Sequence, residues 1–110
     1  MIKLEYFCYK NDKKYEVEME VFRSLMNEQF RDAYLSMKGI ETDVTLYFYE
    51  KDSYVFQHRK IVKNQIDSNG LNILPIVVLN GKIVKQGSLL TNEELEEIFE
   101  IGLDVQIDSQ

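Results

Sequence analysis

The sequence contains one cysteine, Cys8, the side chain best suited to nucleophilic or redox chemistry. A reactive thiol needs a lowered pKa, and Lys10, Lys13 and Lys14 follow closely enough to supply positive charge. Ordinary dithiol exchange is excluded, because no second cysteine is present. Cys8 also shares its strand parity with apolar residues, and cysteine is often buried in cores. A packed cysteine and a reactive single thiol are therefore the two interpretations.

The other chemically versatile side chains form no recognisable site. His58 is the only histidine, and it stands beside Arg59 and Lys60 without other residues at metal-ligand spacing, as is typical of a solvated surface residue. One cysteine cannot make an intrachain disulfide or a cysteine-rich zinc site. The serines lack a nucleophile elbow, and no glycine-rich phosphate loop occurs. We predict no catalytic residue, no metal site and no cofactor.

The charge disfavours general binding to nucleic acid. The chain has 13 Lys and Arg against 19 Asp and Glu, a net charge of −6, whereas phosphate backbones attract positive charge. Weak binding is left open only if two basic clusters form one patch: Lys10, Lys13 and Lys14, and His58, Arg59, Lys60 and Lys63. They are more simply solvated faces. A run of acidic residues at 93–100 is a surface for a basic protein partner.

The length of 110 residues and the apolar share of 45% predict one folded domain, residues 1–110, with a frayed tail from about Asp104. No apolar run approaches the roughly 18–20 residues needed to span a bilayer. The first residues lack the basic and apolar regions of a secretory signal. A single cysteine fits a reducing compartment, most simply the cytoplasm.

Periodicity predicts the first half of the fold. Residues 2–8 alternate, which indicates a strand with one buried face formed by Ile2, Leu4, Tyr6 and Cys8. A polar loop follows at 9–15. Apolar residues then recur at steps of three and four up to Met37, which predicts one long helix ending at Gly39. Residues 44–49 alternate again and predict a second strand.

The second half begins with a helix that Asp52 or Ser53 can cap and that ends at Asn69-Gly70. The continuous apolar run 73–79 indicates a central strand covered on both faces. Asn80-Gly81 then predicts a tight hairpin into a strand at 82–86. Thr91 and Glu94 form the capping box of a last helix, with Leu95, Ile98 and Phe99 facing the core.

The resulting order, β-α-β-α-β-β-α, is an α/β fold of the thioredoxin-like type. It predicts a four-stranded mixed sheet flanked by helices, with the strands in the spatial order two, one, three, four. Because the first helix is longer than its strands and rich in Met, a homodimeric contact along it is an alternative to a single core.

Pro75 is the only proline and opens the third strand. Thioredoxin-like folds place a cis proline at this point, beside the end of the first strand. The corresponding region here is Cys8, Tyr9, Leu74 and Pro75. A trans proline that simply starts a strand is the alternative.

Residues 74–87 read LPIVVLNGKIVKQG and are followed by Glu94-Leu95 and Phe99. This arrangement resembles the C-terminal half of the ArsD family, whose pattern is LP-x4-(D/N)G-x2-V-x2-G. The first strand is similar too. The resemblance implies a thioredoxin-like arsenical-resistance protein that binds trivalent arsenic or antimony through loop cysteines, passes it to an efflux ATPase and in some cases represses its own operon.

The metalloid site is where this chain departs from the resemblance. In the loop after the first strand it carries Asn11, Asp12, Lys13 and Lys14 instead of cysteines. Trivalent arsenic favours soft thiolates, and one thiol cannot supply three. We therefore expect a non-catalytic, ArsD-like binding or regulatory module, acting through a protein partner or as a homodimer. The alternatives are a single-thiol redox or transfer protein using Cys8, and a weak transcriptional regulator.

Overall fold

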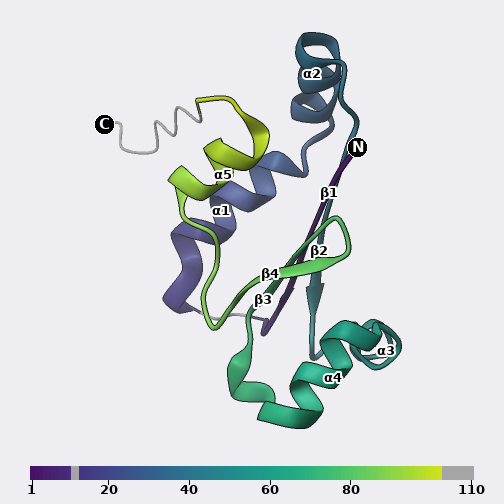
Figure 1. Ribbon diagram of the computed structural model, residues 1–110. Helices are drawn as coiled ribbons and strands as arrows, with labels where there is room; N and C mark the ends of the chain where they lie inside the picture. The colour runs from purple at the N-terminus through teal and green to yellow at the C-terminus, as the bar shows by residue number, and fades with distance from the viewer. Residues whose placement is uncertain (11–12, 103–110) are drawn as a thin grey trace.

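The computed structural model describes residues 1–10 and 13–102 (Figure 1). The predicted loop residues Asn11 and Asp12 and the predicted frayed tail lie outside the described residues. The elements are β1 (Ile2–Cys8), a 3₁₀ turn (Lys13–Tyr15), α1 (Glu16–Leu25), α2 (Glu28–Lys38), β2 (Thr42–Phe48), α3 (Ser53–His58), α4 (Lys60–Asn69), a 3₁₀ turn (Leu71–Ile73), β3 (Ile76–Leu79), β4 (Lys82–Gln86) and α5 (Asn92–Phe99).

The four strands form one mixed sheet in the order β2-β1-β3-β4, as predicted. β1 runs parallel to β2, with Leu4 opposite Val44, and antiparallel to β3, with Phe7 opposite Ile76. β3 and β4 form the hairpin, in which Asn80 and Gly81 both adopt positive φ, as a type I′ turn requires. This is the arrangement of a thioredoxin-like fold.

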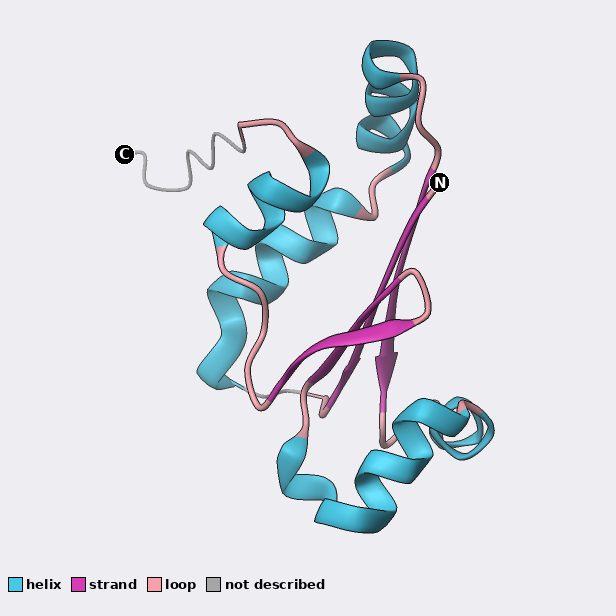
Figure 2. Cartoon of the chain, viewed as in Figure 1, coloured by secondary structure: helices cyan, strands magenta, loops and turns pink. Residues whose placement is uncertain are grey.

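Helices cover both faces of the sheet (Figure 2), and each face has its own core. The first core cluster joins α1, α2 and α5 to residues of β1, including Tyr6 and Cys8. The second joins α3 and α4 to Phe7 and to residues of β3. The capping box of α5 is present, and Glu94 also accepts a hydrogen bond from Lys85 at 2.7 Å. No helix within the described residues is long and apolar enough to cross a membrane.

The prediction of one long first helix is wrong, because the chain breaks between α1 and α2. Asn27 takes an extended conformation and caps α2, its side chain accepting a hydrogen bond from the Gln29 N–H at 2.7 Å. A side chain that binds the backbone in this way favours a helix start over a helix interior. α2 ends at Gly39 in the left-handed conformation, as predicted. The argument for a dimer contact from the length of one helix therefore does not hold.

The second helix is also divided, at Arg59, whose backbone is extended between α3 and α4. Asp52 occupies the N-cap position, but its carboxylate accepts from the Phe48 N–H at 2.9 Å instead of from the helix. The third strand begins at Ile76, three residues later than predicted, because residues 71–73 form a 3₁₀ turn. The apolar run alone could not separate that turn from the strand.

β1 has two buried faces, contrary to the prediction of one. Glu5 and Phe7 are as buried as Tyr6 on the opposite face. β1 lies in the interior of the sheet, between β2 and β3. Helices pack on both faces of the sheet at this strand. This placement gives Glu5 a burial that its residue type does not suggest.

Candidate functional site

Cys8 is the last residue of β1 and lies in the first core cluster. Its side chain is 3% exposed, so it faces inward as its strand parity predicted. Its backbone carbonyl accepts a hydrogen bond from the Tyr49 N–H at 2.8 Å. Both observations describe a residue built into the sheet rather than one presented to solvent.

The groups that would activate Cys8 are arranged unfavourably. A helix N-terminus lowers a thiol pKa, but α1 begins only at Glu16, and its first turn carries the carboxylates of Glu16 and Glu18. The Lys14 ammonium lies 5.5 Å from the centre of the Tyr15 ring. The geometry therefore favours the packed interpretation of Cys8 over the reactive one.

The backbone brings the four predicted site residues close together. Extending the register beyond Phe7 and Ile76 places Cys8 opposite Pro75 and Tyr9 opposite Leu74. The Leu74-Pro75 peptide bond is cis, and both residues are buried. The side chains divide, however: Tyr9 and Leu74 pack in the second core cluster, whereas Cys8 packs in the first. The sheet therefore separates the thiol from its neighbours in this region.

Tyrosine hydroxyls and one glycine hold the loops around Pro75. Tyr9 donates to the Leu71 carbonyl at 3.3 Å, and Tyr15 donates to the Gly87 carbonyl at 2.9 Å. The Gly87 N–H donates to the carbonyls of Ile73 and Pro75, both at 2.9 Å. Sequence reasoning missed the part played by Tyr15. The polar groups here bond to one another, so the region is a structural junction between β1, β3 and β4.

A buried ion pair, also missed from the sequence, ties α4 to the sheet. The guanidinium of Arg59 donates to both carboxylate oxygens of Glu5, at 2.5 and 2.9 Å. The Arg59 guanidinium also lies over the Phe7 ring, 5.5 Å from its centre. Hydrogen bonding to Glu5 raises the pKa of Arg59, partly opposed by burial. The predicted strand order could have revealed the pair, because a carboxylate in a central strand needs a buried partner.

The remaining sequence candidates lie on the surface. His58 is exposed and stacks on Tyr54, with ring centres 3.9 Å apart. In its basic cluster Arg59 pairs with Glu5, and Lys63 pairs with Asp67 at 2.6 Å. Within residues 1–10 and 13–102, no three His, Cys, Asp or Glu side chains are grouped so that they could hold a metal ion.

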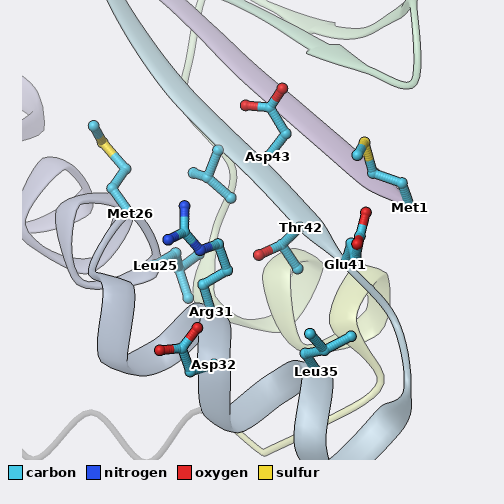
Figure 3. A pocket seen from close by; sticks show the side chains of 10 residues that line it. Met1, Leu25, Met26, Arg31, Asp32, Leu35, Glu41, Thr42 and Asp43 are labelled. Carbon is cyan, nitrogen blue, oxygen red and sulfur yellow. The ribbon is translucent and has the colours of Figure 1, made fainter.

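A pocket of about 410 Å³ opens at the other end of β1 from Cys8 (Figure 3). Its lining comes from the start of β1, the end of α1, α2 and the first residues of β2, namely Met1, Leu25, Met26, Arg31, Asp32, Leu35, Glu41, Thr42, Asp43 and Val44. No residue of this pocket was a site candidate in the sequence. No periodic pattern reveals it, since it depends on where α2 turns away from α1.

Residues 17–109 match the family model described as arsenical resistance operon protein ArsD. The chain belongs to the ArsD family. This confirms the resemblance found in residues 74–99. The match begins after Cys8 and the loop that follows it. The assignment to the ArsD family therefore rests on the segment containing Pro75 and on the helices.

One similar solved structure shares the fold of this ArsD-family chain. It is the arsenical resistance operon trans-acting repressor of Bacteroides vulgatus ATCC 8482. The two are 23% identical, the alignment covers 94% of this chain and 97% of the other, and the TM-score is 0.68. At this identity the likeness establishes a shared fold. No curated protein gives a significant match.

Proposed function

We infer that this chain is a non-catalytic binding or regulatory module of the ArsD family that does not hold a trivalent metalloid in a thiolate site. One observation carries the inference: the only thiol of the sequence, Cys8, is 3% exposed within the core. Trivalent arsenic is a soft ion that favours sulfur ligands. A single thiolate inside a packed cluster cannot supply the ligand set.

The module would act in the cytoplasm through a protein partner or a second copy of itself. The acidic helix α5 offers one surface for a basic partner, because Glu93, Glu97 and Glu100 are exposed. Glu94 is already engaged by Lys85 and by the Thr91 N–H, so its charge is partly compensated. Its pKa is lowered chiefly by the hydrogen bond from Lys85.

An arsenite titration tests the proposal. The wild-type chain and Cys8→Ser are each titrated with sodium arsenite, and bound arsenic is measured by native mass spectrometry. We expect neither protein to retain arsenic after buffer exchange. Stoichiometric, tight binding by the wild type that Cys8→Ser loses would contradict the proposal.

A second candidate is transcriptional regulation, favoured by the name of the Bacteroides vulgatus structure, a trans-acting repressor. In this chain the exposed side chains of Tyr54 and Lys60 would then be candidates for contacting DNA. Sequence-specific binding to an operator fragment at physiological salt would support it. Equal binding to operator and unrelated fragments would count against it, since non-specific attraction depends mainly on charge.

A further inference from the structure

The outer edge of β2 carries unpaired backbone groups. β2 pairs on one side with β1 and is the last strand of the sheet. The Ile2 N–H donates to the Glu41 carbonyl, and the Tyr49 N–H donates to the Cys8 carbonyl. In a parallel ladder successive residues alternate their bonding side, so the even-numbered residues of β2 turn their N–H and C=O groups outward.

The C-terminal end of this edge is closed by hydrogen bonds. Phe48 donates to the Asp52 carboxylate, and its carbonyl accepts from the N–H groups of Lys51 and Asp52. Within the part of the chain that the structure describes, the outward groups of Val44 and Leu46 have no such partner, whereas Thr42 at the start of the strand is buried. The middle of the strand is therefore open to a further strand.

The other edge of the sheet is protected, and β2 is not. β4 carries Lys82 and Lys85, and its ladder with β3 is interrupted by a register shift at Val77 and Val78. Lysines and bulges are the usual devices against unwanted strand pairing. The β2 sequence, TDVTLYF, has neither lysine nor proline. The contrast indicates that pairing at β2 is accommodated rather than prevented.

The pocket described above lies directly beside this open edge (Figure 3). Three of the eight exposed large apolar side chains of the described residues line it: Met1, Met26 and Leu35. Such a concentration of exposed apolar side chains marks an interaction site more often than scattered ones do. A side chain projecting from an added strand would meet these apolar side chains in a pocket whose remaining lining is largely charged or polar.

The pocket also specifies the charge of its occupant. Asp32, Glu41 and Asp43 line it with a single guanidinium, that of Arg31, which already contacts Glu28 at 3.5 Å. Carboxylates at the rim favour a partner that brings positive charge. β2 of a second copy contains neither Lys nor Arg, so self-pairing would leave these carboxylates uncompensated.

We propose that the open edge of β2 and the adjacent pocket bind an extended segment of a partner protein, in which an apolar side chain stands next to a lysine or arginine. The segment adds to the sheet as a fifth strand through main-chain hydrogen bonds to Val44 and Leu46. Its apolar side chain enters the pocket, and its cation meets Asp32 and Asp43. Recognition of this kind takes its affinity from the backbone and its specificity from alternate side chains. It does not depend on Cys8 or on metalloid binding.

The test begins with selection from a displayed library of random peptides about seven residues long against the full-length chain. Selected peptides are synthesised and their affinities measured by fluorescence anisotropy. Val44→Pro removes one outward N–H and leaves the ladder to β1 intact, because a proline is tolerated where its nitrogen faces solvent. We expect affinity to fall at least about tenfold, with the amide signals of Val44 and Leu46 shifting on binding to the wild type.

The charge requirement has its own matched pair of variants. Asp32→Lys with Asp43→Lys should weaken binding by about tenfold. Glu16→Lys with Glu20→Lys makes the same change in net charge at exposed positions elsewhere and should alter the affinity less than about twofold. Circular dichroism confirms that every variant folds.

Three outcomes would overturn the proposal. Selection could yield no binder. The selected peptides could bind Val44→Pro and the charge variants as tightly as the wild type, which would place them on another surface. Sedimentation could reveal a dimer that Val44→Pro dissociates, which would make this edge an interface between copies of the chain.

Discussion

The guanidinium of Arg59 forms a two-point ion pair with the carboxylate of Glu5, whose side chain is 1% exposed. Arg59 comes from the extended residue between α3 and α4, and Glu5 comes from the middle of β1. A buried charge is costly unless it is paired. The Glu5–Arg59 ion pair therefore adds to the apolar packing that holds α3 and α4 against the sheet.

Arg59→Met should be among the most destabilising single changes in the chain. It leaves the Glu5 carboxylate buried without its partner, which typically costs about 3–5 kcal/mol. Urea unfolding followed by circular dichroism measures the loss. Lys60→Met, at the exposed next residue, is the control and should stay within about 0.5 kcal/mol of the wild type. Glu5→Leu combined with Arg59→Met should regain most of the lost stability, and failure to do so would assign the cost to packing alone.

Tyr6→Phe should be neutral or stabilising at pH 8. Tyr6 is fully buried and stacks on Phe22, with ring centres 3.6 Å apart. Within the described residues its hydroxyl has no hydrogen-bond partner of acceptable geometry, although the nearby backbone of Leu90 lowers its pKa in part. Removing an unsatisfied buried hydroxyl should change the free energy of unfolding by between zero and about +1 kcal/mol. A loss of stability on urea unfolding would instead reveal a hydrogen bond to this hydroxyl.

The same tyrosine should make the protein sensitive to alkali. Burial raises the pKa of Tyr6 well above its ordinary value, so the folded state keeps the proton when the unfolded state has lost it. The folded protein therefore keeps its full stability below about pH 10 and loses stability as the pH rises above that value. Urea midpoints at pH 8 and pH 11 measure this loss, which should be smaller in Tyr6→Phe. Some loss should persist, because burial also raises the pKa values of Tyr34 and Tyr47.

Tyr34→Phe should loosen α2. Tyr34 is the buried residue of this helix, and its hydroxyl donates to the Phe99 carbonyl at 2.5 Å. The substitution leaves that buried carbonyl without its donor and should cost about 1–3 kcal/mol. Amide hydrogen exchange should quicken over α2 and the end of α5 more than in β1. Tyr54→Phe, at a side chain 71% exposed, serves as the control, and equal exchange in both variants would contradict the anchoring role.

Alkylation of Cys8 by iodoacetamide should require unfolding. The side chain is buried in the first core cluster, so reaction needs the core to open. The native protein should react far more slowly than the protein in concentrated urea, with mass spectrometry counting the adducts. Rapid modification of the native chain would revive the interpretation of Cys8 as a reactive single thiol.

Much of the sheet could be predicted from the sequence, because its signals are local. Alternation placed β1, the Asn80-Gly81 pair placed the hairpin, and Thr91 with Glu94 placed the start of α5. The helix breaks at Asn27 and Arg59 were missed. The periodicity of apolar residues continues through both positions, whereas the breaks depend on a side-chain cap and on a tertiary ion pair.

The candidate site was predicted less completely. Strand parity anticipated the inward direction of Cys8, and the strand order anticipated that the end of β1 would lie beside Leu74 and Pro75. The Glu5–Arg59 pair and the pocket beside β2 join residues far apart in the sequence. The first could have been inferred from the predicted strand order, but the second follows from the direction α2 takes after Asn27.

The joint between α1 and α2 sets a strict limit on chain length at this corner. A helix turns about 100° for each residue, at 3.6 residues per turn. One residue inserted between Asn27 and Tyr34 would rotate the tyrosine away from Phe99 and move Leu35 out of the pocket wall. An insertion before Asn27 would lengthen only the connection, since the cap starts the helix afresh. We therefore expect insertions and deletions in natural relatives to occur before Asn27 and not within the first two turns of α2.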